Sequence, residues 1–217
     1  TVHLDGFSLE FNTPPIEIDL TDEKGTAIRF QSAVNSCILA IADGIQEKKL
    51  MISKRDYVIF NEDVINSAPP ENRDLGCEPD YNAYTGKTNP RPDPAKSGFV
   101  GLRTAGGHLH IGWGEGFNPH DPDHFKTCCT LTKMLDRTFS YTSYLGSETR
   151  RSLYGNVGSF RPKPYGMEYR PLSNNWLFDG HATRVAIMVV DTINNFFPKA
   201  ELFEKANSLV EVRNLSL

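Results

Sequence analysis

Arg103-Thr-Ala-Gly-Gly-His108-Leu-His110-Ile-Gly-Trp113 is the most informative stretch of the chain. In a β-strand, His108 and His110 would point to the same face because they are two residues apart, while Leu109 would point to the opposite face. The two glycines before the histidines allow the backbone to approach a bound group closely. A histidine pair alone is weak support for a metal site. The glycines and Arg103 strengthen the interpretation of this stretch as a strand that binds a divalent cation.

Three other segments show the same spacing between polar residues. The pairs are Glu10 and Asn12, Glu78 and Asp80, and Glu168 and Arg170. This alternation predicts strands with one apolar face and one charged face, although an ordinary solvated sheet face has the same pattern. Because the pairs combine carboxylate, imidazole and guanidinium groups, they favour a site. Carboxylates suit Mg²⁺ or Mn²⁺, and imidazole nitrogen is a good ligand for Mn²⁺.

A basic segment from Gly146 to Gly166 precedes the last of these pairs. It is rich in glycine, serine and arginine, and we predict a loop that contains Arg150, Ser159, Arg161 and Lys163. One guanidinium group can bind two phosphate oxygens at once, and glycine backbone amides add further hydrogen-bond donors. The segment has two interpretations: a clamp for a polyphosphate or a solvated surface loop. Its position directly before Glu168 favours the clamp.

Hydrophobic periodicity predicts the remaining elements. Extended segments are expected at 7–13, 57–60, 75–84, 99–113 and 167–172. Helices are expected at about 28–47, from Pro122 through Leu135 with Asp121 as N-cap, from Trp176 through Ile193, and at about 198–209. Residues 86–97 are expected to form a loop long enough to act as a lid. This alternation of strands and long helices predicts an α+β protein, with a twisted sheet and helices packed on one side.

Length and charge restrict the function class. The 217 residues suit a single domain, 1–217, and the formal net charge of −4 argues against a broad nucleic-acid surface. No stretch approaches the roughly 20 apolar residues that a membrane helix needs. The four cysteines show no CxxC spacing, which favours free thiols in a reducing cytoplasm.

These motifs resemble a known family. Gly107-His108-Leu-His110 resembles the Gly-x-His-x-His strand of glutamine synthetases, and Glu168-Tyr-Arg170 resembles their Glu-x-Arg strand. The chain is more similar still to phage-type carboxylate–amine ligases, COOH·NH2 ligase type 2, which share a fold group with glutamate–cysteine ligases. The matching stretches are Asp5–Pro15, Leu75–Tyr84, Arg103–Trp113 and Tyr154–Trp176.

The resemblance implies a curved antiparallel sheet that holds divalent metals and ATP on its concave face, with helices on the convex face. It implies metal-binding roles for Glu10, Glu78, His108 and Glu168. Arg161 and Arg170 would steady the transferring phosphoryl group, with Arg103 as a helper, and the nucleotide would contact His110, Arg150, Ser159 and Lys163. The implied reaction joins a small-molecule or peptide carboxylate to an amine through an acyl phosphate, using ATP and Mg²⁺ or Mn²⁺.

One family feature has no counterpart in this sequence. Family members begin with a further acidic strand of the Gly-x-Asp-Pro-Glu-Phe kind, and no segment before Glu10 matches it. We therefore expect a ligase domain that lacks this strand. The alternatives are an inactive ligase fold with a structural or interaction role in a phage, and a metal-dependent hydrolase. We expect location in the cytoplasm of a bacterial or phage-infected cell, where the chain could form a homo-oligomer.

Overall fold

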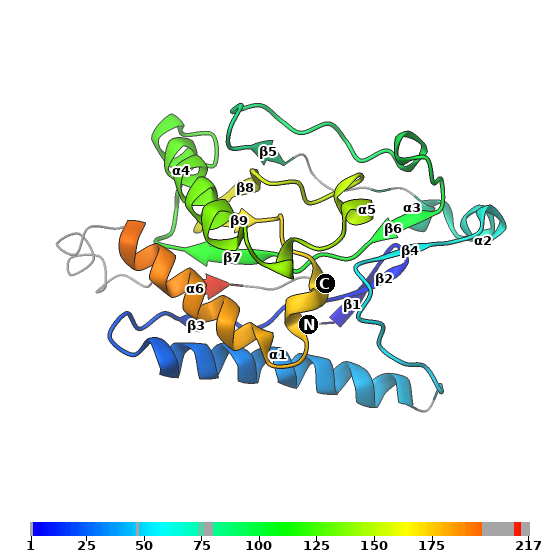
Figure 1. Cartoon of the computed structure of the whole chain (residues 1–217), viewed down its shortest axis with the longest axis horizontal. Helices are drawn as coiled ribbons and strands as arrows, with labels where there is room; N and C mark the ends of the chain where they lie inside the picture. The colour runs from blue at the N-terminus through cyan, green and yellow to red at the C-terminus, as the bar shows by residue number, and fades with distance from the viewer. Residues whose placement is uncertain (1, 47, 74, 76–79, 197–210, 214–217) are drawn as a thin grey trace.

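The structure, a computed structural model, describes residues 2–46, 48–73, 75, 80–196 and 211–213 (Figure 1). Its paired strands are antiparallel, and the largest sheet has six strands in the order β3-β10-β7-β9-β8-β5. This sheet comprises β3 (Ile16–Glu17), β10 (Glu211–Arg213), β7 (Leu109–Gly112), β9 (Gly166–Tyr169), β8 (Ser159–Lys163) and β5 (Tyr81–Asn82). Two smaller sheets pair β1 (Val2–Asp5) with β2 (Ser8–Phe11), and β4 (Tyr57–Ile59) with β6 (Leu102–Thr104).

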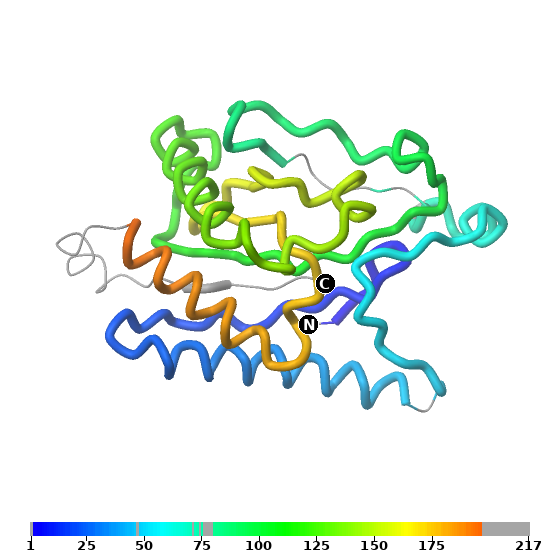
Figure 2. The backbone as a smooth tube through the Cα atoms, viewed as in Figure 1, coloured from blue at the N-terminus to red at the C-terminus, as the bar shows by residue number. Residues whose placement is uncertain are grey.

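The helices are three long ones and several short ones. The long helices are α1 (Glu23–Gln46), α4 (Pro122–Phe139) and α6 (His181–Phe196). The short ones are α2 (Glu62–Ser67), α3 (Pro70–Arg73), α5 (Glu148–Arg151), η1 (Pro94–Ser97), η2 (Ser143–Leu145) and η3 (Asn174–Leu177). Figure 2 shows the segment between β5 and β6 running along the edge of the molecule opposite α1. Among the described residues, no helix is long and apolar enough to cross a membrane.

The core lies between the main sheet and the long helices. On the sheet, alternate residues such as Leu109, Ile111, Phe160, Met167 and Tyr169 are fully or almost fully buried. The helices contribute buried residues at helical spacing, including Phe30 and Val34 of α1, Leu131 and Leu135 of α4, and Val185 and Val189 of α6. The other face of the same strands carries the polar residues. The predicted α+β class is therefore confirmed, and so is the predicted division into an apolar and a charged face for β7 and β9.

Several boundaries differ from the predictions for local reasons. Helix α1 begins before position 28, since the Asp22 side chain accepts a hydrogen bond from the Gly25 amide at 2.9 Å and starts the helix there. The helix predicted to begin near Trp176 is interrupted because Asp179 and Gly180 both adopt positive φ angles. The N-cap at Asp121 is confirmed, with its side chain accepting from the amides of Asp123 and His124.

The prediction of a loop over 146–166 is wrong. Residues 148–151 form α5, and residues 159–163 form β8, which pairs with both β5 and β9. Glycine and proline favoured a loop, but Phe160 is fully buried and anchors this strand to the core. The predicted helix at 198–209 and residues 76–79 of the predicted strand at 75–84 lie outside the described residues.

Gly166, at the turn between β8 and β9, provides a test of the sheet geometry. Its φ is +151°, and a Cβ atom there would overlap the backbone carbonyl of Ile111. We predict that Gly166→Ala lowers the free energy of unfolding by about 2–4 kcal/mol in urea titrations. Gly180→Ala is the control, because Gly180 also has positive φ but open space around it. Its expected loss is about 1 kcal/mol, and equal losses in the two variants would contradict the packing described for the turn.

Candidate functional site

A row of three side chains crosses the polar face of the main sheet. In the register of β7, β9 and β8, His110 lies opposite Glu168, and Glu168 lies opposite Arg161. Directly opposed residues on antiparallel strands have Cβ atoms about 5 Å apart. Strand pairing therefore assembles an imidazole, a carboxylate and a guanidinium from three separate segments of the chain.

Basic groups surround Glu168 on this face. Its Oε2 atom lies 3.0 Å from Nη1 of Arg161 and 3.6 Å from Nζ of Lys163. Its Oε1 atom lies 3.1 Å from Nδ1 of His108 and also contacts Nη1 of Arg170. We refer to Glu168, His108, His110, Arg161, Lys163 and Arg170 as the Glu168 cluster. Glu168 itself is buried, so these groups replace most of the water around its carboxylate.

Burial and neighbouring charges set the protonation of Glu168, His108 and His110. Burial alone would raise the pKa of Glu168, but the hydrogen bond from His108 and the nearby positive charges lower that pKa to about 2. Burial, together with the charge of Arg170, lowers the pKa of His108 to about 3. Burial likewise lowers the pKa of His110 to about 4. At neutral pH the cluster therefore holds an ionised carboxylate, neutral imidazoles and more cations than carboxylates, which suits an anionic ligand.

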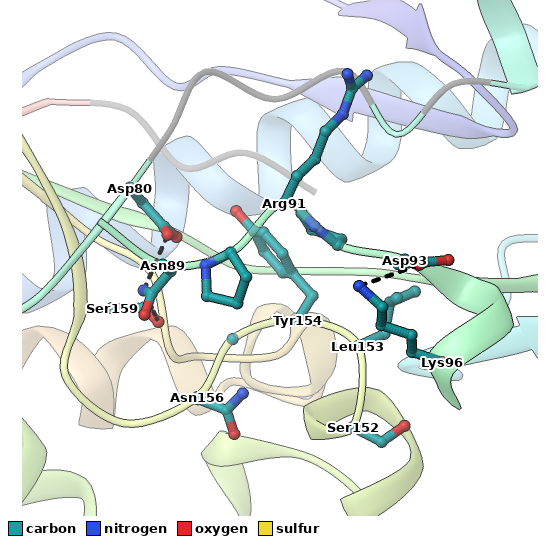
Figure 3. A pocket seen from close by; sticks show the side chains of 13 residues that line it. Asp80, Asn89, Arg91, Asp93, Lys96, Ser152, Leu153, Tyr154, Asn156 and Ser159 are labelled. Atoms are coloured by element: carbon teal, nitrogen blue, oxygen red, sulfur yellow. Dashed lines mark hydrogen bonds and ion pairs between the residues drawn. The ribbon is translucent and has the colours of Figure 1, made fainter. Parts of the chain in front are cut away.

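A second carboxylate, that of Asp80, adjoins the cluster. Its Oδ2 atom lies 3.2 Å from Nε of Arg170, and its Oδ1 atom accepts a hydrogen bond from the side-chain amide of Asn89 at 2.9 Å. The ring of Tyr154 packs on Arg170, with 5.1 Å between the ring centroid and Cζ. Figure 3 shows Asp80, Asn89 and Tyr154 around one end of a cavity. Arg170 is therefore held between two carboxylates and an aromatic ring.

Most of the predicted site residues lie in or beside the Glu168 cluster on the main sheet, whereas Glu10 lies on a different sheet. Besides the cluster, Ser159 lies on the same strand as Arg161, and its Oγ atom is 3.3 Å from the side-chain amide of Asn89. Glu10 lies on the separate β1–β2 hairpin, where its carboxylate is 3.3 Å from the His3 imidazole. Glu78, the remaining predicted metal carboxylate, lies outside the described residues.

Arg150 and Arg103 both use their guanidinium groups to hold the backbone. Arg150 is fully buried, and its guanidinium donates to four backbone carbonyls, those of Ala105, Leu145, Pro171 and Leu172. It connects α5 to the segments that follow β6 and β9, and all its nitrogen donors are used by backbone carbonyls. Arg103 also donates to backbone carbonyls, although it lines a small cavity together with His108.

Three site residues were not predicted from the sequence. Asp80 was paired with Glu78 by its spacing, but no role was assigned to it. Asn89 and Tyr154 lie in segments without strand periodicity, so nothing local distinguishes them from surface residues. The hydroxyl of Tyr154 is buried without a hydrogen-bond partner, which only the structure reveals.

The fit to a divalent cation rests on His108. Its Nδ1 atom faces Glu168, and its Nε2 atom is buried without a hydrogen-bond partner. A histidine whose other nitrogen is held by a carboxylate is a common arrangement beside protein-bound metals. Within the described part of the chain, no group of three or more histidine, cysteine, aspartate or glutamate side chains could hold a metal ion. Mg²⁺ needs only one or two carboxylates when substrate phosphates and water complete its coordination.

Comparison with known proteins identifies a family for the region that holds the cluster. Residues 99–206 match the family described as "Phage phiEco32-like COOH.NH2 ligase-type 2". This region contains every member of the Glu168 cluster, whereas Glu10 and Asp80 precede it. No curated protein and no solved structure matches the chain.

The lowered histidine pKa values predict a loss of stability in mild acid. His108 and His110 stay neutral in the folded chain down to pKa values of about 3 and about 4. In the unfolded chain they bind protons below about pH 6.5, so stability falls with pH in this window by up to about 1.4 kcal/mol per pH unit for each histidine. Urea titrations from about pH 7 to about pH 5 measure this slope. The double variant His108→Asn/His110→Asn should show a shallower slope, and an unchanged slope would contradict the assignment.

The buried guanidinium of Arg150 predicts a structural effect. Replacing it in Arg150→Met leaves buried carbonyls without donors, so we expect a loss of about 3–5 kcal/mol in the free energy of unfolding. The neighbouring Arg151→Met is the matched control, since Arg151 is only half-buried and donates to the single carbonyl of Gly146. Similar losses in the two variants would show that the carbonyl contacts of Arg150 are not structurally important.

Proposed function

The chain belongs to the phage phiEco32-like carboxylate–amine ligase family, and we propose that it uses ATP to join a carboxylate to an amine through an acyl phosphate. The observation that carries the proposal is the Glu168 cluster, because its cations lie on one sheet face around a carboxylate. In this proposal the six-stranded sheet corresponds to the curved catalytic sheet of glutamine synthetases.

Arg161, Lys163 and Arg170 are the proposed phosphate ligands. A guanidinium matches two phosphate oxygens at once, whereas an ammonium acts as a point charge. Phosphoryl transfer requires mainly positioning and charge neutralisation, and these three side chains supply both from rigid strands. In the described structure they bind Glu168, so an incoming phosphate would take the place of that carboxylate.

Two steps account for the reaction. A carboxylate oxygen of the first substrate attacks the γ-phosphorus of ATP, and the bond from that phosphorus to the bridging oxygen breaks to release ADP. The amine, which enters as the free base after losing one proton to solvent, attacks the acyl carbon. The bond between carbon and the phosphate oxygen then breaks, and phosphate leaves with its electron pair and the second proton of the amine.

Glu168 and His108 are the proposed protein ligands of the accompanying Mg²⁺ or Mn²⁺. If a phosphate took Arg161 and Lys163, the Oε2 atom of Glu168 would be released to bind the cation. The free Nε2 atom of His108 points away from Glu168, so it would bind a second divalent cation. The bound cations would neutralise charge on the transferring phosphoryl group. Residues 89–96 border the adjacent cavity and could limit the access of water to the acyl phosphate, as expected of the predicted lid.

We predict that Glu168→Gln and His108→Ala each reduce ADP release at least about 100-fold, because each removes a proposed ligand of the divalent cations that would neutralise charge in the transition state. ADP release with Mg²⁺ and ATP, in the presence of pooled amino acids, measures the effect. Glu62→Gln and His120→Ala are matched controls at exposed positions away from the cluster. Full activity in either cluster variant would contradict the site assignment.

Binding separates the ligase from its alternatives. A non-hydrolysable ATP analogue with Mg²⁺ is expected to raise the melting temperature of the wild-type chain more than the analogue alone does. Absence of any stabilisation by nucleotide would contradict the ligase proposal and favour an inactive fold. Stabilisation by Zn²⁺ without any response to nucleotide would favour a metal-dependent hydrolase.

A further inference from the structure

A cavity of about 680 Å³ opens beside the Glu168 cluster. Residues 89–96 form one wall, and residues 152–156 form another (Figure 3). Asp80, Ser159 and Tyr154 line the end nearest the cluster, and Asp80 connects directly to it through Arg170 at 3.2 Å. A molecule in this cavity would therefore lie next to the cations assigned to the phosphates.

We propose that this cavity binds the amine substrate, and that this substrate is an amino acid or a short peptide rather than ammonia. The inference rests on the proposed ligase function and adds the chemical class of the acceptor. An ammonia molecule is similar in size to water, which occupies only about 30 Å³ in the liquid. The cavity instead falls within the range of about 300–1,000 Å³ that is typical of small-molecule sites.

The charges around the cavity match a molecule with both an ammonium and a carboxylate. Figure 3 shows Asp80 and Lys96 on opposite sides of the cavity, with Tyr154 between them. The Asp80 carboxylate is mostly shielded from solvent and could accept hydrogen bonds from an ammonium. Lys96 is paired with Asp93 at 3.5 Å, and its side chain is 82% exposed. Because an exposed pair of this kind is weak, a substrate carboxylate could replace Asp93 as the partner of Lys96.

Tyr154 adds a hydrogen-bonding group at the inner end. Its hydroxyl is buried and has no hydrogen-bond partner in the protein, although a buried hydroxyl normally has one. Its ring is fixed by Arg170, and it lines both this cavity and the smaller one that contains His108. The hydroxyl is therefore placed where the amine and the acyl phosphate would meet, and a bound amine would supply the missing partner.

The test uses the full chain with Mg²⁺ and a non-hydrolysable ATP analogue, and measures binding calorimetrically. The probes are pools of the common amino acids and the dipeptide Gly-Gly, followed by the N-acetyl and C-amide derivatives of whichever probe binds. We expect saturable binding of the unmodified probe and at least tenfold weaker binding of its N-acetyl form. The C-amide form is also expected to bind more weakly than the unmodified probe, because it lacks the carboxylate that would pair with Lys96.

Variants locate the binding site. Lys96→Met should weaken binding of the amino acid or dipeptide by about two- to fivefold, in line with an exposed ion pair, and should remove the difference between the acid and its amide. Lys126→Met, an exposed lysine on α4, is the matched control and should change neither. Tyr154→Phe should weaken binding of the amine probe and leave binding of the ATP analogue unchanged.

The outcomes separate this inference from the proposed function. If the ATP analogue binds but no amino acid or dipeptide does, the inference is wrong and the ligase proposal stands. If Lys96→Met or Tyr154→Phe weakens binding of the ATP analogue and not binding of the amine probe, the cavity is a nucleotide site and the inference is again wrong. If the nucleotide does not bind at all, the proposed function itself fails.

Discussion

The buried carboxylate of Glu168 is the constraint on which the polar face of the sheet depends. An unpaired carboxylate at this depth would be strongly destabilising, so the fold must hold cations around it. Arg161 and Lys163 reach it from β8, Arg170 from the residue after β9, and His108 from the residue before β7. A register slip of one residue between these strands would turn their charged side chains toward the core. The charge pairing and the hydrophobic packing therefore select the same register.

The two faces of the sheet are linked through the same strands. Tyr169 follows Glu168 and points the other way, where its hydroxyl donates to the buried Asp136 of α4 at 2.9 Å. Burial raises the pKa of Asp136, and the hydroxyl of Tyr169 partly offsets this effect. Helix α4 is thus tied to the strand that carries Glu168 by a polar contact as well as by apolar packing. This arrangement holds the cluster on a rigid element, which suits a site that works mainly by positioning.

The period of two along each strand was enough to predict which residues share a face. His108 with His110, and Glu168 with Arg170, follow from that period alone. This period does not say which strands pair. It therefore could not show that Glu10 lies on the separate β1–β2 hairpin instead of on the main sheet. The carbonyl contacts of Arg150 could not be predicted from the sequence, since three of its four carbonyl partners lie in segments that are distant along the chain.

The carboxylate of Glu168 is neutralised within the cluster, and this limits how an anionic ligand can bind. A phosphate that takes Arg161 and Lys163 from Glu168 would leave the carboxylate with fewer partners in a buried position. A phosphate arriving alone would therefore gain new hydrogen bonds and at the same time leave a costly buried charge. In the proposed function, a polyphosphate that arrives with a divalent cation would avoid this conflict, because the cation would become the new partner of Glu168. The geometry of the cluster thus gives a physical reason for the proposed ligase to bind nucleotide and metal together.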